Sequence, residues 1–94
     1  MIAYPKVKFI EALDDYKLFV IFDNGTIKIY SIKEKLNEEA FTPLKDTNLF
    51  RKVHVASGGY GIIWNDEIDL SEYELWKNGT QVSSLQKIAE DCVS

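Results

Sequence analysis

The single histidine and the single cysteine limit the nucleophilic and metal chemistry that this sequence can support. Any Ser-His-Asp or Cys-His arrangement would have to use His54. Because His54 alternates with Val53 and Val55, we expect its imidazole to point away from the core. Cys92 lies near the end of the sequence, where a nucleophile would be held poorly. Zinc favours several His or Cys ligands at close spacing. We therefore predict no catalytic residue, no metal site and no cofactor.

The acidic residues 66–69 (DEID) form the best remaining cluster for chemistry. Loop carboxylates can bind Mg²⁺ or Ca²⁺, and together with His54 they would make a metal-dependent hydrolase. The spacing, the glycine and the final glutamate of an EF-hand loop are absent. Ser71 follows as a helix N-cap, and acidic residues near it favour the positive end of a helix dipole. We interpret the cluster as a solvated turn before a helix.

The glycine-rich residues 58–61 (GGYG) are a candidate for binding phosphate. The Gly-Lys-Ser/Thr ending of a phosphate loop is missing, and the residues lead into a strand pattern. An anion would therefore find no helix N-terminus at this position. We predict a hairpin turn instead.

The composition is that of one soluble globular domain. The chain has 94 residues, of which 46% are hydrophobic and 28% charged, enough for one core without metal or disulfide. The net charge of −4 disfavours general binding to nucleic acid or anionic membranes, which depends on dense positive charge. We find no secretory leader and no apolar run of the roughly 20 residues that would span a bilayer. One cysteine makes no internal disulfide, so we expect a cytoplasmic protein.

Hydrophobic periodicity and turn residues predict an α+β fold, as a single domain over residues 1–94. We expect an antiparallel β-meander of about five strands, with two or three short helices in a single layer on the sheet. The predicted strands cover residues 7–13, 16–22, 26–30, 52–56 and 61–64. The predicted helical segments are 32–36, a capped turn at 46–50, a helix from 71 to 78, and a short C-terminal helix at 83–92. Ser71 and Glu74 form a capping box for the third segment, and Gly79 closes it.

Turn chemistry predicts the strand registers. The Asn-Gly pair at 24–25 is the strongest hairpin signal, because a type I′ turn needs positive φ at both central residues. The Asp-Asp pair at 14–15 is a second tight turn. If both are two-residue loops, the facing pairs are Phe22 with Ile27, Val20 with Ile29, Phe19 with Tyr30, Phe9 with Val20 and Ile10 with Phe19.

These registers sort the meander into two faces. The predicted core face carries Val7, Phe9, Leu18, Val20, Phe22, Ile27 and Ile29. The second face carries Ile10, Phe19, Ile21 and Tyr30, together with Lys8, Lys17 and Lys28. A face meant only for water would not place four large apolar side chains together. Three covers are open: the C-terminal helix, a protein partner or second copy, and a nucleic-acid strand stacked on aromatic side chains between lysines.

Two sets of segments carry a resemblance to a known family. In the first half these are residues 5–7 (PKV), 15–18 (DYKL) and 22–25 (FDNG). In the second half they are residues 43–46 (PLKD), 49–50 (LF), 52–53 (KV), 63–71 (IWNDEIDLS) and Leu75. Over about residues 4–79 the chain resembles the small bacterial family called domain of unknown function 2442.

The resemblance implies a compact α+β domain with no established activity and no catalytic residue to carry over. Trp64 would be a core anchor, and Asp69 would bond to backbone amides before the helix. Some members are similar to partners in two-gene toxin–antitoxin-like pairs. Some longer members carry a C-terminal helix-turn-helix, for which the residues after Gly79 are too few, so we do not expect sequence-specific DNA binding.

We therefore expect a non-enzymatic protein-binding module, such as the accessory or antitoxin-like half of a bacterial two-gene pair. The partner would be another protein or a second copy of the chain, bound on the second face. The first alternative is a nucleic-acid-binding or regulatory protein that uses the lysine and aromatic side chains. The second is a metal-dependent hydrolase that uses the acidic cluster with His54.

Overall fold

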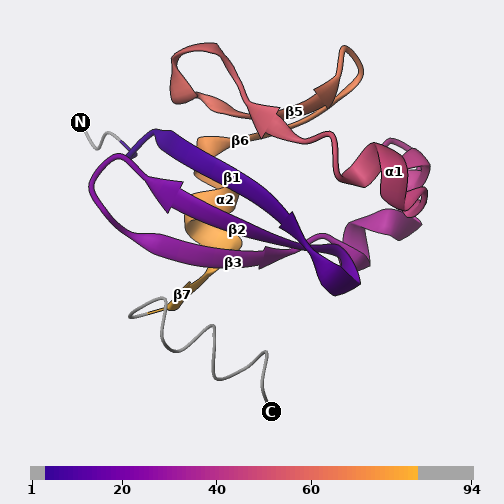
Figure 1. Ribbon diagram of the computed structural model, residues 1–94, viewed down its shortest axis with the longest axis horizontal. Helices are drawn as coiled ribbons and strands as arrows, with labels where there is room; N and C mark the ends of the chain where they lie inside the picture. The colour runs from indigo at the N-terminus through magenta and orange to yellow at the C-terminus, as the bar shows by residue number, and fades with distance from the viewer. Residues whose placement is uncertain (1–3, 83–94) are drawn as a thin grey trace.

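The computed structural model describes residues 4–82, an α+β fold with two antiparallel sheets rather than one meander (Figure 1). The first sheet has the strand order β1-β2-β3-β7 and the second β4-β5-β6. The strands are β1 (Val7–Leu13), β2 (Lys17–Phe22), β3 (Ile27–Ser31), β4 (His54–Val55), β5 (Gly61–Asn65), β6 (Ile68–Ser71) and β7 (Thr80–Val82). The predicted helix at 83–92 and Cys92 lie outside the described residues.

Six short helical segments connect the strands of the described residues, and three of them lie where the sequence predicts helical segments. They are η1 (Asp14–Tyr16), η2 (Lys33–Asn37), η3 (Thr42–Lys45), α1 (Thr47–Phe50), η4 (Ser57–Gly59) and α2 (Glu72–Asn78). The predicted capped turn is α1, whose N-cap Asp46 accepts a hydrogen bond from the Asn48 amide at 2.9 Å. In α2 the Ser71 hydroxyl accepts one from the Glu74 amide at 3.2 Å. No helix within residues 4–82 has the length and apolar character that crossing a membrane requires.

The hairpin between β2 and β3 has a three-residue loop, so the register predicted for it is wrong by one residue. The Gly25 amide donates to the Phe22 carbonyl, and the Phe22 amide donates to the Thr26 carbonyl. Gly25 has φ 88°, whereas Asn24 is not among the positive-φ residues, so the type I′ geometry is absent. The Asn24 side chain instead accepts a hydrogen bond from the Thr26 amide at 3.0 Å. Leu18 rather than Phe19 therefore faces Tyr30.

The turn between β1 and β2 is also one residue longer than predicted. Leu13 pairs with Lys17, which leaves Asp14, Asp15 and Tyr16 in the loop. Asp15 and Tyr16 have φ values of 62° and 58°, a left-handed region that side chains rarely adopt. Tyr16 is held there because its ring packs on Phe50, with ring centroids 5.3 Å apart. Near the start of β1 the register shifts again between residues 7 and 9.

These longer loops exchange the faces of several residues. Val20 on the core face pairs with Ile10 on one side and with Lys28 on the other. Ile10 and Lys28 therefore lie on the core face and not on the second face as predicted. Tyr30 pairs with Leu18, so Tyr30 is also on the core face. The core face of the first sheet carries Val7, Ile10, Ala12, Leu18, Val20, Phe22, Lys28 and Tyr30. The sequence assigns β2 correctly, β3 to the wrong faces, and β1 in part.

The second sheet contains one strand, β6, that the sequence analysis interpreted as a turn. Asn65 turns the chain, because its side-chain oxygen accepts hydrogen bonds from the Glu67 and Ile68 amides at 2.8 and 3.0 Å. Ile68–Ser71 then pairs with β5, so only the first part of the acidic cluster is a turn. Glycine at 61 allows this pairing, since a Cβ there would lie 2.2 Å from the Leu70 carbonyl oxygen.

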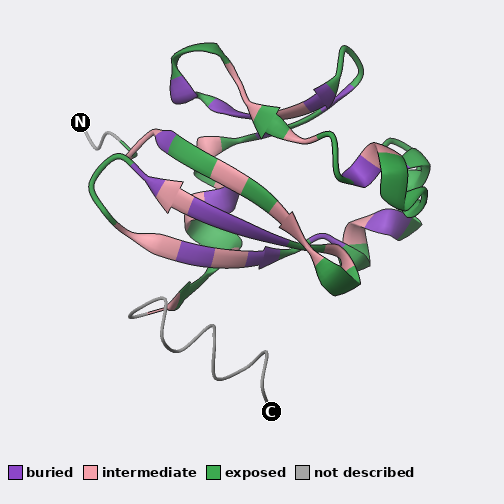
Figure 2. Cartoon of the chain, viewed as in Figure 1, coloured by how far each residue is buried: buried purple, intermediate pink, exposed green. Residues whose placement is uncertain are grey.

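One core lies between the two sheets and α2 (Figure 2). Its largest fully buried side chains are Phe22, Leu18, Ile32, Leu44, Ile62, Leu75 and Val20. The helix α2 lies on the core face of the first sheet, where Trp76 meets Phe22 with ring centroids 5.1 Å apart. Trp64 is the core anchor that the family resemblance implies. Its indole N–H donates to the Phe50 carbonyl at 2.9 Å, which attaches α1 to the second sheet.

Candidate functional site

The face of the first sheet opposite α2 carries apolar side chains that the core does not use. We call it the outer face; its apolar residues are Leu13 in the end row with Lys17, and, in the rows beyond it, Phe9, Phe19, Ile21, Ile27, Ile29 and Val82. The latter form two rows across the strands. One row runs Phe9–Ile21–Ile27–Val82, and the next joins Glu11, Phe19, Ile29 and Thr80. The sequence thus predicts a second apolar face correctly, but only Phe19, Ile21 and Lys17 of its seven proposed residues lie on it.

Phe9 is the most accessible apolar side chain of the outer face. Its exposure is 43%, whereas that of Phe19 beside it is 9%. The two rings meet edge to face with centroids 6.1 Å apart. Phe9 was assigned to the core face because a two-residue loop at 14–15 would pair it with Val20, whereas the three-residue loop pairs it with Ile21; the bulge then returns Val7 to the core face. Phe9 lies at the end of the row that contains Ile21 and Ile27, so the apolar outer face reaches solvent at this side chain.

The three lysines predicted to surround this face are dispersed. Lys17 lies in the outer-face row with Leu13 and Ser31. Lys8 is exposed within the bulge. Lys28 is 9% exposed on the core face, where its ammonium donates to the Trp76 carbonyl and lies 4.2 Å from the centre of the Trp76 ring. The aromatic and lysine side chains therefore do not alternate along one strand of the surface.

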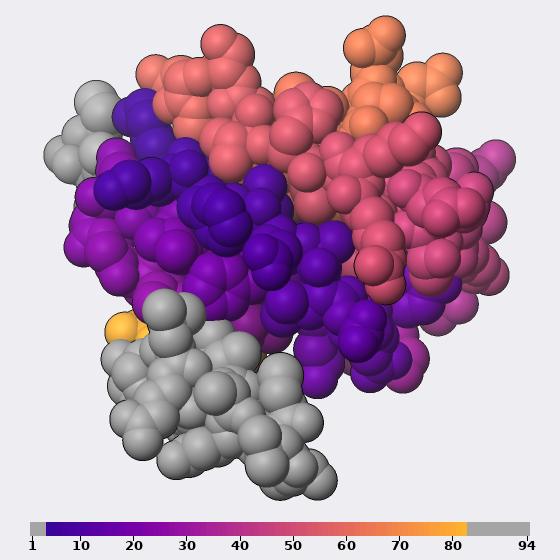
Figure 3. Space-filling view, viewed as in Figure 1, coloured from indigo at the N-terminus to yellow at the C-terminus, as the bar shows by residue number. Residues whose placement is uncertain are grey.

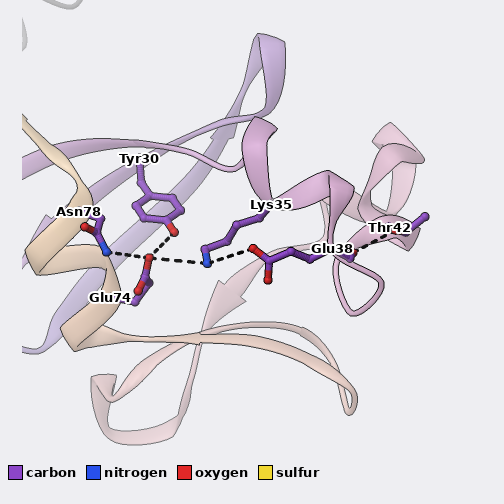
Figure 4. Close-up of polar contacts among 6 residues, drawn as sticks. All are labelled: Tyr30, Lys35, Glu38, Thr42, Glu74 and Asn78. Atoms are coloured by element: carbon purple, nitrogen blue, oxygen red, sulfur yellow. Dashed lines mark hydrogen bonds and ion pairs between the residues drawn. The ribbon is translucent and has the colours of Figure 1, made fainter.

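A polar cluster joins α2 to the edge of the first sheet (Figure 4). The Tyr30 hydroxyl donates to the Glu74 carboxylate at 2.7 Å. Lys35 lies 3.8 Å from Glu74 and 3.9 Å from Glu38, and Asn78 donates to Glu74 at 2.9 Å. Glu74 was expected to complete the capping box, but its side chain serves this cluster instead. The cluster borders an open pocket of about 650 Å³ that adjoins the outer face at Lys17, Ile29 and Thr80.

The Tyr30–Glu74 hydrogen bond shifts the ionisation of both partners. Burial, and then the bond to Glu74, raises the pKa of Tyr30 well above its usual value. The bond to Tyr30 holds the pKa of Glu74 below its usual value, against the opposing effect of burial. Lys35 pairs with both Glu74 and Glu38, and Tyr30 with Glu74, so the cluster connects α2 to the first sheet.

Replacing Tyr30 by phenylalanine should remove about 1.5 kcal/mol of stability at neutral pH, because a hydrogen bond to a charged group is lost. A lowered carboxyl pKa stabilises the folded state above the ordinary value of 4.5 and loses that effect as the pH falls further. A raised tyrosine pKa stabilises it below pH 10.0 and loses that effect above. Urea unfolding at a series of pH values should therefore show, in Tyr30→Phe, a smaller loss of stability below pH 4.5 and a smaller loss above pH 10.0 than in the unmodified protein. The exposed Tyr60→Phe is the control, and equal pH profiles for the two variants would contradict the assignment.

Within the described residues, the groups considered for catalysis lie apart from one another. His54 is exposed, as expected, and its Nδ1 lies 3.2 Å from the Lys52 carbonyl oxygen. In the second sheet His54 on β4 and Asp69 on β6 both pair with Ile63 on the strand between them. Two strand spacings, roughly 10 Å, therefore separate their backbones. Within residues 4–82, no group of three His, Cys, Asp or Glu side chains is placed to hold a metal ion.

The geometry defines the class of this protein as a small α+β domain with two antiparallel sheets, one shared core and an apolar outer face. The profile of a family described as "Protein of unknown function (DUF2442)" matches residues 7–81, and the chain belongs to this family. This confirms the resemblance drawn from the sequence. Neither a curated protein nor a solved structure matches the chain significantly.

Proposed function

We propose that this domain is a non-enzymatic protein-binding module whose outer face binds an amphipathic helix of another protein. The supporting observation is Phe9, which is 43% exposed at the end of the row with Ile21 and Ile27, on the side of the sheet opposite α2. Four strands span about 14 Å between the outermost strand axes, close to the width needed to seat one helix about 10 Å across. Helix docking on such a surface uses apolar residues spaced three and four apart.

The same surface gives less support to nucleic-acid binding. That function would need lysines between stacked aromatic side chains. Lys28 lies in the core and Tyr30 is turned away from the outer face, so the proposed combination is not assembled. A short single-stranded oligonucleotide should therefore show no binding that weakens steeply with salt. The hydrolase alternative has less support still, because His54 and Asp69 are separated by the strand that carries Ile63.

The partner that we propose is the product of the adjacent gene, with this chain as the accessory or antitoxin-like half of the pair. The family resemblance suggests this pairing, and the net charge of −4 suits a basic partner helix with an apolar stripe. Electrostatic complementarity of this kind would raise the association rate, while the outer face would supply most of the affinity.

Phe9→Glu should abolish co-purification with the co-expressed product of the adjacent gene, since it places a charge in the apolar contact. Phe9 is a sharper probe than Phe19, because Phe19 is 9% exposed and its replacement would also disturb packing. The measurement is affinity capture followed by titration calorimetry. Tyr60→Glu is the matched control, because Tyr60 is 61% exposed and precedes β5 in the second sheet. Equal capture by both folded variants would refute the proposed surface.

A further inference from the structure

We propose that residues 83–92 of this chain are the intramolecular occupant of the outer face and compete there with the partner helix. That residues 83–92 cover the outer face does not depend on any partner. That they compete with a partner helix rests on the proposed function. The proposal stands on where β7 ends, on the size of the outer face, and on the order of apolar residues in the sequence that follows.

The position of β7 brings this segment to the outer face. Val82, the last residue of β7, pairs with Ile27 in the row that also contains Ile21 and Phe9. The next residue therefore begins at the edge of that row. β7 is an outermost strand of the first sheet and β1 is the other, so a segment that crosses the sheet from Val82 passes over Ile27 and Ile21 before it reaches Phe9.

The length and pattern of the segment match this path. Ten residues in helical conformation extend about 15 Å, and three strand spacings amount to about 14 Å. Leu85, Ile88, Ala89 and Cys92 recur at intervals of three and four, which places them on one side of a helix. The intervening Gln86, Lys87, Glu90 and Asp91 are all polar. The segment thus has one apolar stripe and needs one apolar surface.

Competition follows from shared use of the same contacts. A partner helix that needs Phe9 and the isoleucine row must displace the segment. Its apparent affinity is therefore reduced by the fraction of molecules in which the face is already covered. Weakening the segment's contacts should raise the affinity for the partner without changing any residue of the outer face.

The first test is made on the unmodified full chain. Nuclear Overhauser effects between the Ile88 methyl groups and the rings of Phe9 or Phe19, or the methyl groups of Ile27, are the expected result. Assigned spectra in which Ile88 shows contacts to none of these side chains would overturn the proposal. This measurement does not depend on the behaviour of any variant.

The second test compares Ile88→Glu with Gln86→Glu in the full chain. Both add one negative charge, but only Ile88 lies on the apolar stripe. Ile88→Glu should shift the amide resonances of Ile27 and Ile29 and increase the fluorescence of the dye ANS, while Gln86→Glu should do neither. Identical behaviour of the two variants would refute covering of the face. If Ile88→Glu uncovers the face and leaves partner affinity unchanged, the cover stands and the competition fails. If Phe9→Glu also binds the partner normally, it is the proposed function that fails.

Discussion

Trp64→Ala should lower the free energy of unfolding by about 3–5 kcal/mol, the usual cost of truncating a buried aromatic side chain. Trp64 is 4% exposed, and its ring stacks on Phe50 with centroids 6.4 Å apart. The substitution removes the packed ring and leaves the Phe50 carbonyl without its indole donor. A small domain is stable by only about 5–15 kcal/mol. The variant should therefore be close to unfolded at physiological temperature, which urea denaturation followed by circular dichroism would measure.

Two further variants separate the contributions within this effect. Trp64→Phe retains most of the ring but not the N–H, so it should cost about 1–3 kcal/mol for the unpaired carbonyl of Phe50. Tyr60→Ala removes an aromatic side chain that is 61% exposed, and should change stability by no more than about 0.5 kcal/mol. A loss from Trp64→Ala no greater than that from Tyr60→Ala would contradict the anchoring role.

The parts of the fold that the sequence predicts best are those fixed by local chemistry. Asp46 and Ser71 cap helices because a side-chain oxygen there satisfies an amide that the helix leaves unpaired. The β2 strand is predicted because residues 18–22 (LFVIF) are all β-branched, aromatic or leucine. Neither inference requires knowledge of what lies elsewhere in the chain.

The registers could not be predicted because two loop geometries compete at each turn. Asn-Gly suits a type I′ turn, but the same residues also fit a type I turn followed by a left-handed glycine. The second geometry prevails here, together with hydrogen bonds from the Asp23 amide to the Lys6 carbonyl and from the Lys6 amide to the Asp23 carboxylate. These contacts join residues 17 apart in the chain. A single extra loop residue then reverses the face of every side chain in β3.

The second sheet was missed for a related reason. The Ile68–Ser71 sequence alternates apolar and polar residues, but it follows two acidic residues and precedes a helix cap. In isolation that context favours a helix-leading turn. Pairing with β5 makes it a strand, and the edge of the second sheet comes to lie beside β1 (Figure 3). Residues of the two sheets close one core, a long-range arrangement that no local pattern encodes.

The errors in register change which residues form the candidate site, but the site itself remains. Apolar residues in excess of one core face remain in excess whichever register applies, so the sequence predicts that a second apolar face exists. Which residues form it depends on loop length. Ile27 and Ile29 replace Ile10 and Tyr30, and Phe9 joins them. The resulting face is more purely apolar, because Ile27 and Ile29 lie on it and Lys28 between them lies on the core face.

Lys28 provides the sharpest experimental distinction between the two registers. Its ammonium donates to the Trp76 carbonyl, one of the last carbonyls of α2, which the helix itself leaves unpaired. Lys28→Met keeps an apolar chain of similar length but removes the charge and the donor, so it should cost about 1.5–3 kcal/mol. Lys17→Met is the matched control. Lys17 is exposed on the outer face, where removing the ammonium should change stability by no more than about 0.5 kcal/mol.

The two-residue turn would place both lysines on the same accessible face and predict two small, equal effects. The three-residue turn predicts a large difference between them, with Lys28→Met also loosening the last turn of α2. Urea denaturation of the two variants measures the difference in stability, and amide hydrogen exchange at Gly79, whose N–H donates to the Leu75 carbonyl, locates it. Because the register of β3 decides which side chains a partner meets, equal stabilities would remove Ile27 and Ile29 from the outer face and return Tyr30 to it.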